Sequence, residues 1–232
     1  RHPQPVDYMQ QEISYLDLME VLLEAGVDPN VRLEKNLWYT TYARDLLGVN
    51  RSGATPFWRA AHATDVAAMK LLVRYGADPT IATSKTPDRR RRTGDQEDFS
   101  GLPSVPVGGK AVSPIVAAAG VGYGQGFAGN SHRHVPDGWI PAIKYLVEEH
   151  GADVNDRDHN GYSPVHHAAA RGDNELILYL VSLGADVTLV SRSGQTTVDL
   201  ANGPVQRIQP FPETIALLES LGAINNHNCV TC

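Results

Sequence analysis

One stretch decides the fold: residues Asp158–Val187, which read DHNGYSPVHHAAARGDNELILYLVSLGADV. Its first four residues are turn formers, and the glycine among them can adopt positive φ. Ser163 and Pro164 predict a helix start, with the serine as N-cap and the proline at the first helical position. A second helix is predicted over Asn174–Ser182, because apolar residues recur there at three- and four-residue steps, and Gly184 ends it. This unit of about 30 residues cannot bury its own apolar face, so it predicts a repeat.

The same unit recurs along the chain. Pro56 and Gly76 are twenty residues apart, as are Pro164 and Gly184. We therefore predict an all-α solenoid of stacked helix-turn-helix units, about five in number. The units lie near residues 1–30, 50–80, 111–155, 156–188 and 189–223, with insertions at 31–49, 81–110, 120–138 and 202–212 and a tail at 224–232. Further second helices are predicted over Leu16–Glu24, Val66–Arg74, Trp139–Glu149 and Glu213–Ser220.

The repeated unit resembles the ankyrin repeat family, whose pattern is G-x-T-P-L-H-x-A-A followed by a helix that ends L-L-x-x-G-A-D. Departures occur at Thr64, where the pattern has the glycine between the helices, and at Thr197, where it has proline. The resemblance implies a protein-interaction module without enzymatic activity or cofactor. The insertions and a terminal Cys-x-x-Cys also resemble a bacterial subfamily of ankyrin proteins. The strongest matches are Gly53, Thr55, Pro56, Ala60 and Ala61, then Gly161, Pro164, His166, Ala168 and Ala169, and the closing glycines 76, 151, 184 and 222.

Composition limits the classes of partner. The chain has 232 residues, of which 42% are hydrophobic, enough for one elongated domain or two compact ones. The net charge is −6, whereas nucleic-acid-binding proteins usually have an excess of basic residues. The basic run Arg89–Arg92 is followed by acidic residues, which favours a solvated segment over a nucleic-acid site. The sequence contains no run of 18 apolar residues, so it predicts no membrane span. The chain begins at Arg1 without Met, so we expect residues upstream, and both cytoplasmic and exported locations are compatible.

We expect a partner protein to bind the concave face, formed by the turn tips and first helices, together with the loop insertions. Aromatic and arginine side chains are the usual anchors of such interfaces. His166 lies at the pattern's own histidine position, where we expect a structural hydrogen bond to a neighbouring turn. The predicted contacts are Trp58, Arg59, His159, Tyr162 and His167, with Tyr123 and Phe127 from the insertion 120–138.

Two alternatives use other parts of the chain. Cys229 and Cys232 are the only cysteines, and their spacing fits a local disulfide, a redox pair, half of a zinc site or, with a following histidine, a haem attachment. The chain would then be the accessory part of a redox, haem or metal protein. The glycine-rich insertion 120–138 offers a second alternative, a pocket for a small ligand.

Overall fold

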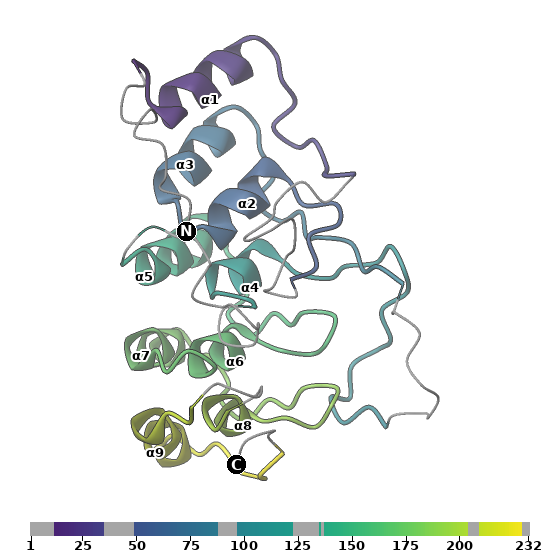
Figure 1. The fold of residues 1–232 in the computed structure, drawn as a ribbon, viewed down its shortest axis with the longest axis vertical. Helices are drawn as coiled ribbons and strands as arrows, with labels where there is room; N and C mark the ends of the chain where they lie inside the picture. The colour runs from purple at the N-terminus through teal and green to yellow at the C-terminus, as the bar shows by residue number, and fades with distance from the viewer. Residues whose placement is uncertain are drawn as a thin grey trace, which may run out of the picture.

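The structure, a computed structural model, describes residues 12–34, 49–87, 97–122, 135, 137–203 and 209–228. These residues form a stack of helix pairs (Figure 1). Within them no β-strand occurs, only an isolated bridge between Ser84 and Lys110. The prediction of an all-α ankyrin-type solenoid is confirmed. The elements are α1 (Tyr15–Glu24), α2 (Pro56–His62), α3 (Val66–Arg74), α4 (Pro114–Ala118), α5 (Trp139–Lys144), the π-helix η3 (Tyr145–Glu149), α6 (Pro164–Ala169), α7 (Asn174–Ser182), α8 (Thr197–Ala201) and α9 (Pro212–Ser220).

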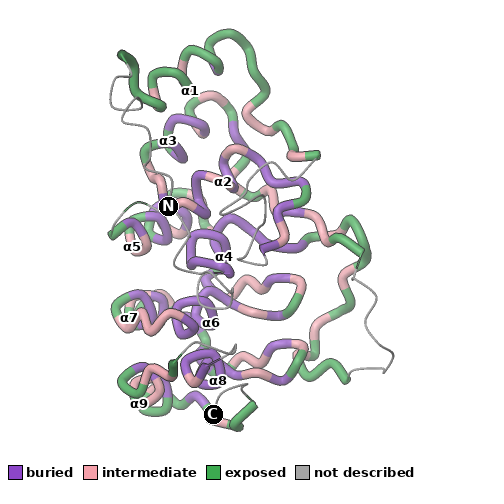
Figure 2. The backbone as a smooth tube through the Cα atoms, in the orientation of Figure 1, coloured by how far each residue is buried: buried purple, intermediate pink, exposed green. Residues whose placement is uncertain are grey.

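The helices stand in two columns (Figure 1). One column holds the first helices of the units, α2, α4, α6 and α8, and the other holds the second helices, α1, α3, α5, α7 and α9. Each of α2, α6 and α8 packs against its own second helix, and neighbouring first helices also pack on one another. The buried residues concentrate where the columns meet (Figure 2). Neighbour contacts of this kind make stability a sum over adjacent units.

Local signals in the sequence set the helix ends. The Thr55 hydroxyl accepts the amide of Trp58 at 3.1 Å, at the start of α2. The Asp173 carboxylate accepts the amide of Leu176 at 3.0 Å, at the start of α7. Each such cap stabilises a helix by about 1 kcal/mol. The predicted ranges of α3 and α7 are confirmed, and the helix predicted over Trp139–Glu149 is confirmed in extent, although η3 forms its second half.

The turn between the two helices of a unit needs a residue with positive φ. Gly172 provides it between α6 and α7, with φ of 73°. Thr64 takes the equivalent place between α2 and α3 with φ of 54°, and its hydroxyl donates to the carbonyl of Ala63 at 2.7 Å. The threonine therefore keeps the geometry that the glycine of the pattern provides.

The insertion 81–110 contains an ordered strap, which we define as residues 97–110. Its carboxylate Asp98 pairs with Arg192, and the amide of Phe99 donates to the carbonyl of Arg192 at 3.2 Å. At the other end Lys110 forms an ion pair with Asp156 at 2.5 Å. The strap runs along the turn side of the stack to the turn before α8 (Figure 1). It thus ties the last unit to the middle of the solenoid.

Candidate protein-interaction surface

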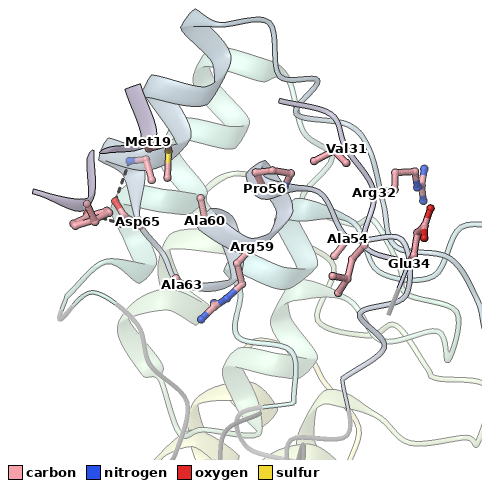
Figure 3. A pocket seen from close by; sticks show the side chains of 13 residues that line it. Met19, Val31, Arg32, Glu34, Ala54, Pro56, Arg59, Ala60, Ala63 and Asp65 are labelled. Atoms are coloured by element: carbon pink, nitrogen blue, oxygen red, sulfur yellow. Dashed lines mark hydrogen bonds between the residues drawn. The ribbon is translucent and has the colours of Figure 1, made fainter. Parts of the chain in front are cut away.

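A groove with a volume of about 750 Å³ lies between α1, α2 and the segment 31–34 (Figure 3). Its floor is one face of α2, made by Pro56, Ala60 and Ala63. These positions are spaced i, i+4 and i+7, so they share one side of the helix. Met19 from α1 and Val31 from the segment beyond it form the walls. Val31 is 52% exposed, so it is an accessible apolar wall of the groove.

The polar groups at the rim are held by specific bonds. Asp65 accepts the hydroxyl of Tyr15 at 2.7 Å and the amide of Ala68 at 3.0 Å. Partial burial, together with the Asp65 carboxylate, raises the pKa of Tyr15 to about 12. Arg32 donates to the carbonyl of Ala82 at 2.9 Å. These bonds fix the walls around the apolar floor.

Arg59 stands at one edge of the groove (Figure 3). The residue as a whole is half-buried. Burial, and next the charge of Arg51, lower the pKa of Arg59.

The prediction that Trp58 contacts a partner is wrong for this conformation, because its side chain is 0% exposed. Its indole Nε1 donates to the carbonyl of Val112 at 2.9 Å, and its ring stacks on His62 at 5.1 Å between centroids. Trp58 follows Pro56 by two residues, as His166 follows Pro164. It therefore fills the histidine position of the repeat, and its indole reaches the turn of the next unit.

The prediction that His167 contacts a partner is also wrong for this conformation, since its side chain is 1% exposed. Its ring lies 5.9 Å from that of Tyr162, and its Nε2 is 3.9 Å from a carboxylate oxygen of Asp158. The side chain of His167 thus points to the turn that precedes α6. Burial lowers the pKa of His167 to about 3 and raises the pKa of Asp158 to about 7. The pair is therefore buried in neutral form at mildly acidic pH.

His166 has the structural role predicted for it, although its bond is to its own turn. Its Nδ1 accepts the amide of Ser163 at 3.2 Å and lies 2.9 Å from the hydroxyl of that serine. Full burial lowers the pKa of His166 to about 3, so the ring stays neutral and Nδ1 remains an acceptor. The ring therefore helps to fix the start of α6.

His159 and Tyr162 are half-buried on the turn before α6. The hydroxyl of Tyr162 donates to Gln195 at 2.5 Å, and the amide of His159 donates to the carbonyl of Ala111 at 2.8 Å. The carbonyl of His159 accepts from Arg192, which also holds the strap. The structure thus places these two residues beside the strap, in a different unit from Arg59.

The remaining predicted residues lie outside the described ranges: Tyr123, Phe127, Cys229 and Cys232. Most of the glycine-rich insertion 120–138 lies outside them too. Within the described residues, no three or more of His, Cys, Asp and Glu are grouped to hold a metal ion. None of the helices described is both long and apolar enough to cross a membrane.

Comparison with known proteins gives the family. Residues 52–84 match the ankyrin repeat, and residues 131–181 match ankyrin repeats in many copies. The chain is an ankyrin-repeat protein. These matches fall on the units that contain α2 with α3, and α5 through α7.

Three relatives illustrate the similarity. Human BCL-6 corepressor-like protein 1 is 40% identical over 76 residues, which are 33% of this chain and 4% of that protein. Mouse protein phosphatase 1 regulatory subunit 27 is 38% identical over 69 residues, 30% of this chain and 44% of that protein. Rat ankyrin repeat and SAM domain-containing protein 6 is 36% identical over 85 residues, 36% of this chain and 9% of that protein. The chain thus spans less than half of each relative, and since all three are mammalian, the bacterial subfamily stays a prediction.

Sequence reasoning missed the groove itself. The signal was the partial first unit, which has a second helix, α1, but no first helix among the described residues. Where one unit has no first helix, the first helix of the following unit has no neighbour on that side, and one of its faces is left uncovered. Exposed apolar residues that follow α1, such as Val27 and Val31, were a second signal.

Proposed function

We propose that this ankyrin-repeat chain is a non-enzymatic scaffold that binds a partner protein. The observation that carries the proposal is the apolar groove of about 750 Å³ between α1 and α2, with Arg59 at its edge. Large exposed apolar surfaces with a polar rim are typical of protein interfaces, and arginine is a frequent anchor in them. Ankyrin repeats in a relative named as a phosphatase regulatory subunit support the same general role.

We propose two contact regions. The first is the groove with Arg59. The second is the turn before α6, where His159 and Tyr162 are half-buried beside the strap. The predicted contacts Tyr123 and Phe127 would belong to the insertion 120–138. The backbone bonds of the turn and the strap hold the second region rigid, so binding there loses little conformational entropy.

Site-specific photo-crosslinking in cells tests this function. A benzoylphenylalanine residue placed at Arg59 or at His159 is expected to form an adduct with the same partner protein. Leu178, which is exposed on α7 in the other column, is the matched control and is expected to form none. Equal labelling from all three positions, or no protein adduct from Arg59 and His159, would contradict the scaffold function.

The alternatives that use the tail and the glycine-rich insertion remain hypotheses. Mass spectrometry and metal analysis of the intact protein test the first, through the state of Cys229 and Cys232. A bound haem or metal ion would favour the redox or metal role, and an intact disulfide without either would remove it. Ligand screening with a variant of the insertion 120–138 tests the second.

A further inference from the structure

The strap reaches the turn before α8, where one arginine holds it (Figure 1). The terminal nitrogens of Arg192 donate to the carboxylate of Asp98. They also donate to the carbonyl of Leu102 at 3.2 Å and to the carbonyl of Pro103 at 2.6 Å. Residues 97–103, which we name the strap tip, contain all three acceptors. One side chain of the solenoid thus binds several groups of a single short segment.

The same turn also contacts the aromatic residue of the strap tip. The amide of Phe99 donates to the carbonyl of Arg192 at 3.2 Å. A Cβ added at Gly194 would lie 3.1 Å from the ring of Phe99, so the ring lies against the backbone of that glycine. The tip is therefore held by a carboxylate–guanidinium pair, by backbone groups and by an aromatic ring. Proteins use contacts of these kinds to bind peptides of other chains.

The solenoid fixes Arg192 through bonds in which the strap takes no part. The Nε of Arg192 donates to the carbonyl of His159 at 2.9 Å, and its backbone amide donates to the carbonyl of Asn160 at 2.9 Å. The amide of Gly194 donates to the carbonyl of Ser191, also at 2.9 Å, and closes the turn. Without the strap tip, the guanidinium would thus remain placed for another carboxylate, and its binding would cost little conformational entropy.

The strap tip itself is only loosely covered. Every residue of the strap is exposed or half-buried, and Phe99 is 57% exposed. The side chain of Asp98 is 39% exposed, and an ion pair so accessible to water contributes little to stability. The base of the strap has bonds of its own, because the amide of Lys85 donates to the carbonyl of Gly109 at 2.8 Å. The tip can therefore leave Arg192 while the base stays attached.

We propose that the turn around Arg192 is a peptide-binding site, occupied by the strap tip in the free protein, and that a partner segment with a carboxylate next to an aromatic residue binds there in its place. This inference rests on the proposed scaffold function and names the chemistry of the partner segment. A tethered segment competes at an effective concentration on the order of 1 mM. A partner that also contacts His159 and Tyr162 displaces the tip, whereas a peptide that copies the tip alone binds weakly.

Fluorescence anisotropy with a labelled synthetic peptide tests the inference on the full chain. The probe is EDFSGLP, the sequence of residues 97–103. Asp98→Ala removes the strap's own carboxylate from Arg192, so the site is open for a larger fraction of the time. The probe should then bind at least about fivefold more tightly than to the unsubstituted chain. Glu97→Ala is the matched control, because it removes the same charge from the exposed neighbouring residue, and it is expected to leave the affinity unchanged.

Substitutions in the probe and in the turn identify the groups that are recognised. On the Asp98→Ala chain, a probe with alanine in place of its aspartate or its phenylalanine is expected to lose affinity. A probe with alanine in place of its glutamate is expected to keep it. Adding Arg192→Ala to the same chain should abolish binding, with far-UV circular dichroism as the check that the fold is kept.

Three results would overturn the inference. The first is absence of probe binding to the Asp98→Ala chain, or equal tightening by Asp98→Ala and Glu97→Ala. The second is binding that Arg192→Ala leaves unchanged, because the peptide would then lie elsewhere. The third is a set of crosslinks from Arg59 and His159 to one partner without any probe binding, which would leave the scaffold function standing and reject the peptide site.

Discussion

Three buried titratable groups at the start of the fourth unit predict how stability depends on pH. Folding raises the pKa of Asp158 from 3.8 to about 7, because burial disfavours the charged carboxylate. Folding lowers the pKa of His166 and of His167 from 6.5 to about 3, again mainly by burial. The charges of Arg157 and Arg171 contribute to the lowering. The aspartate therefore stabilises the fold at low pH, and the two histidines stabilise it at neutral pH.

Together, the three groups make the number of protons bound by the unfolded and the native state differ by one. Stability from the histidines is present above pH 6.5 and is lost as pH falls, while stability from Asp158 is present below pH 3.8 and is lost as pH rises to about 7. At about pH 5 the unfolded state thus binds two more imidazole protons and one fewer carboxyl proton than the native state. The free energy of unfolding should fall by about 1.4 kcal/mol for each pH unit between about 6 and 4.

Two substitutions move this slope in opposite directions. Asp158→Asn keeps the side-chain oxygen that accepts the amides of the turn and removes the opposing proton, so the slope should double to about 2.7 kcal/mol per pH unit. His167→Gln removes one imidazole proton, so the slope should approach zero. Urea unfolding followed by far-UV circular dichroism at several pH values measures both. A slope that Asp158→Asn leaves unchanged would refute the reasoning, because it would show that the carboxylate is ionised in the folded protein.

Three further predictions test the local structure. Ser163→Ala should lower the free energy of unfolding by about 1–2 kcal/mol, because its hydroxyl contacts a buried imidazole. Ser113→Ala should change it by less than about 0.5 kcal/mol, since its buried hydroxyl has no hydrogen-bond partner in the part of the chain that the structure describes; urea unfolding compares the two. Gly172→Ala and Gly184→Ala both force alanine into positive φ, but only at Gly172 would the new Cβ lie 2.5 Å from an aromatic ring. The melting temperature of the Gly172→Ala variant should therefore be lower than that of the Gly184→Ala variant, by the equivalent of about 1–3 kcal/mol. Arg192→Ala should speed amide hydrogen exchange in residues 97–103 of the strap and leave α2 and α3 unchanged, as measured by mass spectrometry.

The regular parts of the fold could be predicted because each helix carries its own start and stop. Asp173 before α7 and Gly184 after it are local signals, and they place the helix without knowledge of its neighbours. The direction of a side chain on a first helix is less local. Arg59 and His167 occupy the same position of the repeat, three residues after the proline. One lines the groove and the other is buried beside Asp158, because their neighbours differ.

Contacts made by the insertions were beyond the reach of the sequence pattern. Asp98 and Arg192 pair across the strap, although 94 residues separate them. No repeat frame links such positions, so no spacing rule predicts them. Trp58, by contrast, was predictable: it stands at the histidine position of the repeat, and that position had already indicated a structural role for His166.

The central claim is that the chain is a scaffold that binds a partner protein. Photo-crosslinking from Arg59 and His159, with Leu178 as the control, tests it most directly. We predict an adduct with the same partner protein from the first two positions and none from Leu178, which is exposed on α7 in the other column. Equal labelling from all three positions, or no protein adduct from Arg59 and His159, would contradict the claim.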